Sequence, residues 1–546
     1  MVKTSNKSDI LIIAVAFIVT VIFTPVSFDA LIIPKVFILF CFTLYLLPNI
    51  IIEIKTLKVK KKSKLLAAVL PIFIFIQLIA IMLISSAPLD QQLFGRTGRG
   101  FGLVTYFSFI ILTIASVIYI DLKRINLLVL GLLLSVYVSS FYSILQRHNL
   151  DMFNWNSRTN GIIGTLGNPN FQSSFATLAV LPTIVYFWQK KNKLIWTPFF
   201  TIFLLYTIYI CESTQGYIGL AASVIIFILI RVWFYSKKFF YTLLPLPIFM
   251  GIIALLGMTN RGPLSTYLYK VSVQSRGDFW RSAFTTANEN PIFGVGLDSF
   301  GDYYLLNRDD IAAGHTFAEL TDNAHNYFLE FAAIGGYPLA AIYLSLMFYT
   351  LFCFIKLFKQ SSSFNPLMTA LFTAWTVLQL QSVISPGNLV LFMWNFIISG
   401  SVIGYQNFKR DLSFQVQVQS LKPKVSIAGS FLLIFGVIFL YPWFDSDRML
   451  LNGLNTKNAN IVIDAVDSYP RSIVKINLVG VQLLQSNLAV ESLGLARSTT
   501  KWNPNSPSGW GLILANPKAS REERLQAKAK VLQLDPKNNK VKEFNP

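Results

Sequence analysis

The stretch TDNAHNYFLEFAAIGGYPLAAIYL (residues 321–344) joins a polar cluster directly to an apolar helix. From Tyr327 onward it holds long apolar side chains and a single acidic residue, a composition typical of a segment that crosses a membrane. His325, one of only three histidines in the chain, stands at the junction. The sequence therefore predicts a membrane-spanning helix that carries a histidine where water meets lipid.

The same composition extends over most of the chain. Of its 546 residues, 54% are hydrophobic and only 13% are charged, which excludes an ordinary soluble globule. Apolar runs of about 20 residues, each long enough for a hydrocarbon core of about 30 Å, recur along it. We expect about thirteen spans, near residues 10–26, 30–52, 65–86, 101–120, 125–146, 171–188, 194–212, 216–235, 240–258, 325–357, 366–385, 387–405 and 425–444.

The predicted fold is all-α, with two parts. A transmembrane domain covers residues 1–445 and includes a long outward loop at 259–322. A connection of that length is usually functional, so we expect this loop to contribute to the activity. Residues 446–546 are polar and form a small helical domain, in which WNPNSP (502–507) and VLQLDPKN (531–538) resemble the turns between tetratricopeptide repeats. Such repeats bind peptides or partners, and a plain helical cap on the membrane domain is the alternative.

The basic residues divide by type between alternate loops. Lysine-rich segments such as KTLKVKKKSK (55–64) and QKKNK (189–193) fall on one side if every span crosses once. Positive loops stay in the cytoplasm. We therefore expect a multi-pass protein of the bacterial cytoplasmic membrane, with a cytoplasmic N-terminus and an extracytoplasmic C-terminal domain.

The opposite loops carry arginine instead of lysine. Arginine binds phosphate or carboxylate through two parallel hydrogen bonds and does not lose its charge. An anionic ligand on the outer face is therefore predicted, and solvated ion pairs with Asp302, Asp309 or Asp310 are the alternative. The outward arginines are Arg96, Arg99, Arg147, Arg158, Arg261, Arg276, Arg281 and Arg308.

The polar residues around His325 suggest a helix start. Asp322 or Asn323 is expected to cap a helix that begins near Ala324, which places His325 in the first turn. The helix dipole there keeps the imidazole neutral and able to accept a proton. Glu330, at the membrane edge, needs a partner. A polar anchor without catalytic function is the alternative interpretation of His325.

Two further stretches have similar features. Arg276 and Arg281 lie on nearby faces of one helix predicted inside the long outward loop. Asn168 followed by proline indicates a cap and a first-turn proline, with Arg158 just upstream.

Together these stretches resemble the O-antigen ligase/polymerase superfamily. GTLGNPNF (164–171) and DNAHNYFLEFAAIGG (322–336) look like its paired signatures, and SRGDFW with NPIFGVGLDSF (275–300) looks like the segment that precedes its histidine motif. The resemblance implies a GT-C-like integral membrane glycosyltransferase that needs no metal and no cofactor. It also implies transfer of a glycan from an undecaprenyl-diphosphate carrier to an acceptor on the outer side of the membrane.

The resemblance also implies roles for single residues. Arg158, Arg276, Arg281 and Arg99 would hold the diphosphate. His325 would take a proton from the acceptor hydroxyl, or would only hydrogen-bond the phosphate; the sequence leaves both roles open. The supporting residues are Asn326, Glu330, Asn168 and Asn170.

Other functions remain as alternatives. A solute transporter is disfavoured because ionisable residues are nearly absent from the middles of the spans. A non-catalytic scaffold gives the outward arginines no specific task. No metal site is expected, because His148, His315 and His325 are widely separated. GVG (294–296) lacks the strand and helix context of a nucleotide loop, so no dinucleotide site is expected. No nucleic-acid partner is expected either. The expected partners are the lipid-linked donor, the bilayer and an acceptor hydroxyl on a glycan, lipid or protein. A protein bound by residues 446–546 is a further candidate partner.

Overall fold

The computed structural model describes residues 7–56, 62–120, 124–153, 155, 162–190, 194–315, 320–408 and 423–545. Over these residues the chain folds into helices without a β-strand, so the predicted all-α class is confirmed there. The apolar helices are α1 (Lys7–Val21), α2 (Ile32–Thr56), α3 (Lys62–Ile84), α5 (Leu103–Tyr119), α6 (Ile125–Arg147), α7 (Pro169–Trp188), α8 (Trp196–Ile210), α9 (Thr214–Tyr235), α10 (Lys237–Leu243), α11 (Pro245–Met258), α16 (Tyr327–Gln360), α17 (Pro366–Ile384), α18 (Leu389–Phe408) and α19 (Pro423–Thr456).

These helices make a polytopic membrane protein. In the described part of the chain, nine helical segments are long and apolar enough to cross a bilayer, with α10 and α11 counted as one. The shorter apolar helices α1, α3, α5 and α8 coincide with the other predicted spans. Each predicted span thus falls on an apolar helix, while the total of thirteen crossings stays a prediction.

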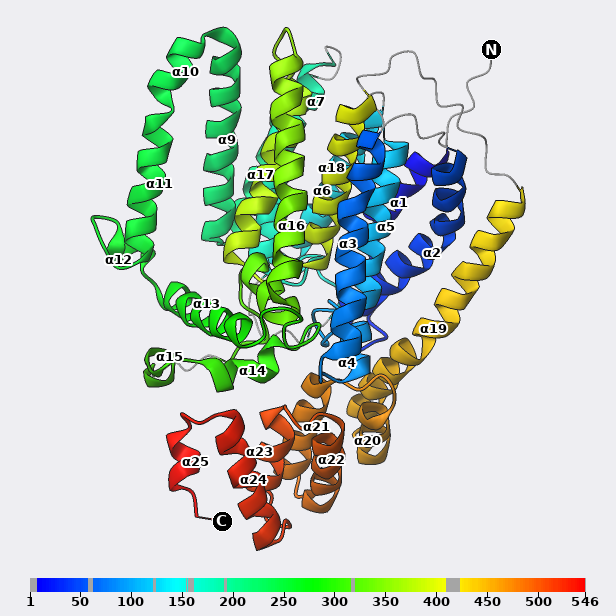
Figure 1. The fold of residues 1–546 in the computed structure, drawn as a ribbon, viewed down its shortest axis with the longest axis vertical. Helices are drawn as coiled ribbons and strands as arrows, with labels where there is room; N and C mark the ends of the chain where they lie inside the picture. The colour runs from blue at the N-terminus through cyan, green and yellow to red at the C-terminus, as the bar shows by residue number, and fades with distance from the viewer. Residues whose placement is uncertain are drawn as a thin grey trace.

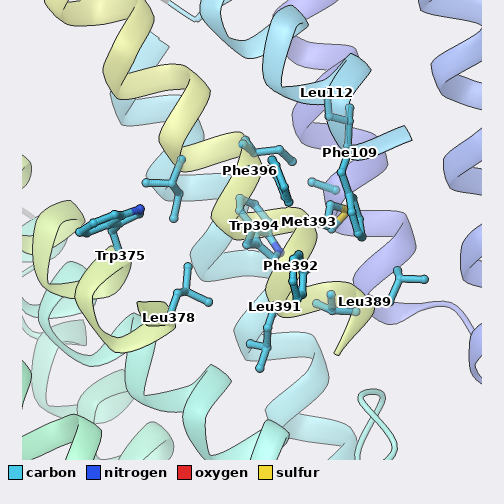
Figure 2. Packing of buried hydrophobic residues seen from close by; sticks show 14 of the residues in the cluster. Phe109, Leu112, Trp375, Leu378, Leu389, Leu391, Phe392, Met393, Trp394 and Phe396 are labelled. Carbon is cyan, nitrogen blue, oxygen red and sulfur yellow. The ribbon is translucent and has the colours of Figure 1, made fainter. Parts of the chain in front are cut away.

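The core of the bundle is built around α18. Its span from Leu389 to Gln406 is wholly buried in the protein. Figure 2 shows Phe392, Trp394 and Phe396 of α18 between residues of α5 and α17. Phe109 of α5 stacks on Phe392 and Phe396 at 5.8 and 5.5 Å between ring centroids. Because lipid is as apolar as these rings, close packing rather than water exclusion holds the helices together.

The two ends of the bundle differ in what they carry. Figure 1 shows the α9–α10 and α16–α17 turns at one end, and the C-terminal helices at the other. The first end holds lysines such as Lys237 and Lys359. The second holds the arginine-bearing segments around α4 (Leu89–Phe94) and α13 (Val271–Glu289). The two ends thus differ in the segments they carry, and which end faces the cytoplasm stays a prediction.

The predicted loop 259–322 is largely helical. It contains α12 (Ser265–Leu268), α13, α14 (Phe300–Asn307) and α15 (Asp310–Gly314). Helix α13 is much longer than the short helix expected around Arg276. It packs against α16 and α14, so the segment forms a folded layer over the end of the bundle.

A kink in α16 fixes this layer in place. Gly336 has φ +73°, a left-handed conformation that interrupts the helix, and a Cβ there would lie 2.4 Å from the carbonyl carbon of Ile292. The loop between α13 and α14 fills the kink, because Val295 N donates to Ala333 O at 3.0 Å. The kink thus allows close contact between α16 and this loop.

The C-terminal part consists of short helices packed in sequence order: α20 (Ala459–Asp467), α21 (Ile473–Gln485), α22 (Ala489–Trp502), α23 (Pro507–Ala515), α24 (Arg521–Leu534) and α25 (Asn539–Glu543). Helix α19 runs through the predicted boundary at residue 446 and ends at Thr456. The last apolar helix and the first part of the C-terminal domain are thus one helix. The likeness to tetratricopeptide repeats stays a prediction.

Buried polar contacts attach this domain to the bundle. Lys475 of α21 forms an ion pair of 2.8 Å with Asp447 of α19, and both side chains are buried. The carboxylate of Asp447 also accepts a hydrogen bond from the backbone N–H of Asp29 at 2.7 Å. Because a buried charge without a partner is costly, this pair fixes the orientation of α21.

We expect Lys475→Met to loosen the C-terminal domain. The substitution keeps most of the side-chain volume but leaves Asp447 buried without a cation, which costs about 3–5 kcal/mol. The exposed pair of Arg448 with Asp445 provides the control; Arg448→Met should cost less than about 1 kcal/mol. Thermal unfolding of the full chain in detergent at pH 7 measures both. Equal losses for the two variants would contradict the assignment.

Candidate functional site

The helix start near His325 differs from the prediction. Asn326, not Asp322 or Asn323, is the N-cap of α16: its Oδ1 accepts hydrogen bonds from Phe328 N at 3.0 Å and from Leu329 N at 3.1 Å. The predicted start near Ala324 is therefore wrong, because the side chain of Asn326 reaches the first-turn amides and its backbone is extended. His325 precedes the helix.

The backbone of His325 is held in an unusual conformation. Its φ of +51° lies in the left-handed region, which few residues other than glycine adopt. The motif's own side chains fix it: His325 N donates to Asn323 Oδ1 at 2.9 Å, and Ala324 N donates to Glu330 Oε2 at 2.6 Å. These two hydrogen bonds hold the turn that carries the imidazole.

The imidazole of His325 is neutral at physiological pH. Burial, and next the positive charge of Arg276, lower its pKa to about 4. The ring packs against Phe279 with 5.2 Å between centroids. Within the described residues, its Nδ1 is buried and has no hydrogen-bond partner. A helix dipole is not the cause of the neutral state, because His325 lies outside the first turn.

Helix α13 brings Arg276 to the histidine. Arg276 and Phe279 are three residues apart, so they share a helix face. Phe279 contacts the ring of His325, and the charge of Arg276 acts on its pKa. Arg276 also donates to Ser272 O at 3.0 Å. Sequence segments far apart in the chain thus place one guanidinium and one neutral imidazole together.

Arg99 is a buried hub of ion pairs. Its Nη1 donates to Asp322 O at 2.6 Å, its Nη2 lies 3.2 Å from Glu330 Oε1, and its Nε lies 3.4 Å from Asp298 Oδ1. Burial alone would raise the pKa of Asp322, but the charges of Arg99 and Arg96 outweigh it and hold that pKa below its usual value. The charge of Arg99 is therefore shared among carboxylates that frame the His325 turn.

Arg281 is also paired. It contacts Asp309 at the start of α15 and forms a bridge of 2.6 Å with Asp278 on its own helix. Asp278 in turn contacts His315 Nδ1 at 2.7 Å. The structure therefore contains, at Arg281, the alternative that the sequence left open: an ion pair with Asp309 in the loop.

The asparagines near residue 168 are structural. Asn168 caps α7 by accepting from Asn170 N at 2.8 Å, as predicted. Asn170 Oδ1 accepts from Ser213 Oγ at 2.7 Å, which ties α7 to the start of α9. Arg158 lies outside the described residues.

Sequence reasoning missed Asn388. Its Nδ2 donates to Leu166 O at 3.0 Å and its backbone N donates to Tyr327 OH at 3.4 Å, so it joins the 164–171 segment to the histidine motif. Its Oδ1 accepts from Val390 N at the start of α18. The signal was present: SPGN (385–388) stands immediately before an apolar run, which is a cap signature.

A large cleft opens beside the histidine. Its volume is about 1790 Å³, and its walls come from the bundle and from the C-terminal helices. His325, Asp322, Gly167 and Gly98 line one part of it. No cluster of three or more His, Cys, Asp or Glu residues arranged for a metal ion occurs among the described residues.

We expect Arg99→Ala to unfold the site rather than only weaken ligand binding. It leaves buried Asp298 and Glu330 without their cation, at a cost of about 3–5 kcal/mol. Arg276→Ala, at a partly exposed position, should cost less than about 1 kcal/mol. Thermal unfolding in detergent distinguishes them. An Arg99→Ala variant as stable as the parent would show that the hub is not structural.

Comparison with known proteins agrees with this arrangement. Residues 199–344 match a family model described as O-antigen ligase. An uncharacterized protein of Haemophilus influenzae is 29% identical over 202 residues, which are 33% of this chain and 49% of that protein. The chain thus matches about half the length of this relative. The family match includes α13 and the His325 turn, so this region is similar to an O-antigen ligase domain and supports a membrane glycosyltransferase type of function.

Proposed function

We propose that the chain transfers a glycan from an undecaprenyl-diphosphate carrier to an acceptor hydroxyl at the outer face of the cytoplasmic membrane. The observation that carries this proposal is the neutral His325, which has a left-handed backbone, lines a large cleft and lies within reach of the positive charge of Arg276. A neutral imidazole accepts a proton, and a guanidinium binds a diphosphate. The match to O-antigen ligase over the same residues supports it.

The chemistry follows from these two groups. The acceptor oxygen attacks the anomeric carbon of the donor sugar, and the bond from that carbon to the diphosphate oxygen breaks. His325 takes the proton of the attacking hydroxyl, and the undecaprenyl diphosphate leaves with the bonding electrons. Arg276 stabilises the negative charge that grows on the leaving group, and such stabilisation is usually the largest catalytic effect.

The other arginines have different roles in the proposal. Arg99 and Arg281 already share their charge with carboxylates, so they hold the walls of the site in position. Glu330, through Ala324 N and Arg99, and Asn326, through the first turn of α16, fix the histidine turn. Arg158 stays a proposed diphosphate ligand in addition to Arg276.

The position of the site suits a lipid-linked donor. His325 precedes the first turn of α16, an apolar helix long enough to span the bilayer. A diphosphate at Arg276 would then lie at the end of the bundle, and the polyprenyl chain would extend between helices into lipid. Protein, lipid and glycan hydroxyls all remain chemically possible acceptors for this geometry.

His325→Ala and Arg276→Ala should each abolish most transfer while the fold is retained. Loss of a general base costs about 10²–10⁴-fold in rate, and loss of one charge-stabilising group costs about 10²–10³-fold. The assay uses purified protein, lipid-linked glycan and acceptor, and it measures the mass gained by the acceptor. Arg497→Ala, which removes an exposed pair with Glu523, is the control. Full activity of His325→Ala would refute the proposal.

The rate of transfer should be insensitive to pH from about 7 to about 5 and fall as the pH passes through about 4. The sign follows from the lowered pKa: His325 is neutral above about 4 and becomes protonated, hence unable to act as a base, below it. A pH–rate profile measures this directly. Half-loss near the ordinary histidine pKa of 6.5 would contradict a buried neutral base.

Asp29 provides the control for this profile. It lines the same cleft, and burial, together with the charge of Asp447, raises its pKa to about 6. Asp29→Asn removes this titration and should leave the fall near pH 4 in place. If the profile of Asp29→Asn lost its fall near pH 4, the group responsible would not be His325.

A further inference from the structure

One wall of the cleft is a single face of α21. Its residues follow helical spacing and include both aliphatic and amide side chains. Asn477, Gln482 and Gln485 are exposed there. The face consists of Val474, Asn477, Leu478, Val481, Gln482 and Gln485. A whole helix face that is uncharged and open to a cleft suits a neutral ligand that has both apolar patches and hydrogen-bonding groups.

The cleft also contains an aromatic shelf, formed by Phe153 and Trp155. Both rings pack edge-on against Phe23, with centroids 5.3 and 5.4 Å apart. Phe23 in turn stacks on Tyr142 at 5.1 Å. The shelf is therefore part of a larger aromatic cluster, and its rings are supported from behind.

Asp151 fixes the orientation of this shelf. Its Oδ2 accepts from Trp155 Nε1 at 2.8 Å and from Tyr142 OH at 2.8 Å, and its Oδ1 accepts from Phe153 N at 3.0 Å. Gln146 Nε2 donates to the same carboxylate at 2.9 Å. Rings held in this way lose little freedom when a ligand stacks on them, so the shelf is pre-organised for binding.

The acidic side chains in the walls have ion-pair or hydrogen-bond partners, and Lys540 adds one exposed positive charge at the edge of the lining. Arg96 pairs with Asp302 at 2.7 Å, and Asp535 pairs with Arg308 at 2.8 Å. Asp29 accepts from Gly98 N at 2.7 Å. The volume of about 1790 Å³ exceeds the roughly 300–1,000 Å³ of pockets for drug-sized ligands. The cleft thus suits a long and mainly uncharged molecule.

We propose that the cleft binds a chain of pyranose sugars, the acceptor of the transfer, between the aromatic shelf and α21. A pyranose ring presents a flat C–H face that stacks on Trp155 and hydroxyl groups that the amides of α21 bind. This inference rests on the proposed function, because it assigns the glycan end nearest His325 as the attacking hydroxyl. It favours a growing or surface-bound glycan over a protein as acceptor.

The test measures binding apart from catalysis. Short oligosaccharides released from the host's own surface glycan are titrated into the purified full chain by calorimetry, and a serine-containing peptide of similar length is the comparison ligand. Trp155→Leu should weaken oligosaccharide binding about tenfold, from loss of the stacking contact. Trp155→Phe keeps a ring and should bind almost as well as the parent. Gln482→Ala tests the opposite wall, with a loss of several-fold.

Matched controls separate binding from folding and from transfer. Trp188→Leu replaces an exposed tryptophan at the end of α7, outside the cleft, and should leave binding unchanged. Arg276→Ala, at a position that does not line the cleft, should bind the oligosaccharide like the parent while its rate of transfer falls about 10²–10³-fold. Thermal unfolding of each variant shows whether the fold is retained.

Each outcome decides between the two proposals. The proposal that the cleft binds a glycan is overturned if the peptide binds and the oligosaccharide does not. It is also overturned if neither Trp155→Leu nor Gln482→Ala weakens oligosaccharide binding. Neither result contradicts the proposed transferase activity. Oligosaccharide binding that depends on Trp155, in a protein that transfers no glycan from the lipid carrier, overturns the proposed function instead.

Discussion

The site depends on one buried guanidinium. Arg99 contacts Asp298 in the loop after α13, and Asp322 and Glu330 on either side of His325. Arg99, Asp298 and Glu330 are buried, and none of these three charges is stable inside the protein alone, so they must meet for the end of the bundle to form. Glu330 then has one oxygen for Arg99 and the other for Ala324 N, which fixes the turn at the neighbouring histidine. The need to pair the buried charges therefore also fixes the backbone position of His325.

The layer that carries Arg276 is fixed by backbone contacts instead. The kink at Gly336 frees carbonyls of α16 inside the protein, and the loop that follows α13 supplies N–H groups to them. Buried backbone groups must find partners, so the loop and the kink require each other. Because the loop also includes Asp298, the two constraints act on the same segment. Arg276 and His325 are therefore set against each other by ion pairs on one side and by a helix kink on the other.

Local patterns in the sequence predict part of this. Apolar runs locate the helices, the Asn-Pro pair locates the start of α7, and the family resemblance associates Arg276 with His325. What the sequence cannot supply is the pairing of distant residues: Arg99 and Glu330 are 231 positions apart, so neither pattern nor spacing links them. The start of α16 was misplaced because Asp322, Asn323 and Asn326 are all good caps, and only the fold shows which side chain faces the first turn. The ion pairs of Arg281 with Asp278 and Asp309 also depend on the fold, and its spacing from Arg276 does not predict them.

Helix α19 has a mechanical consequence. It extends from the apolar part of the bundle to Thr456, and Asp447, which holds α21, lies on it. It also packs along α2. A change of bilayer thickness alters the tilt of a membrane helix. Because α19 continues into the C-terminal domain and binds α21 through Asp447, its tilt would change the position of α21. The width of the cleft between α21 and His325 would then depend on the thickness of the surrounding lipid.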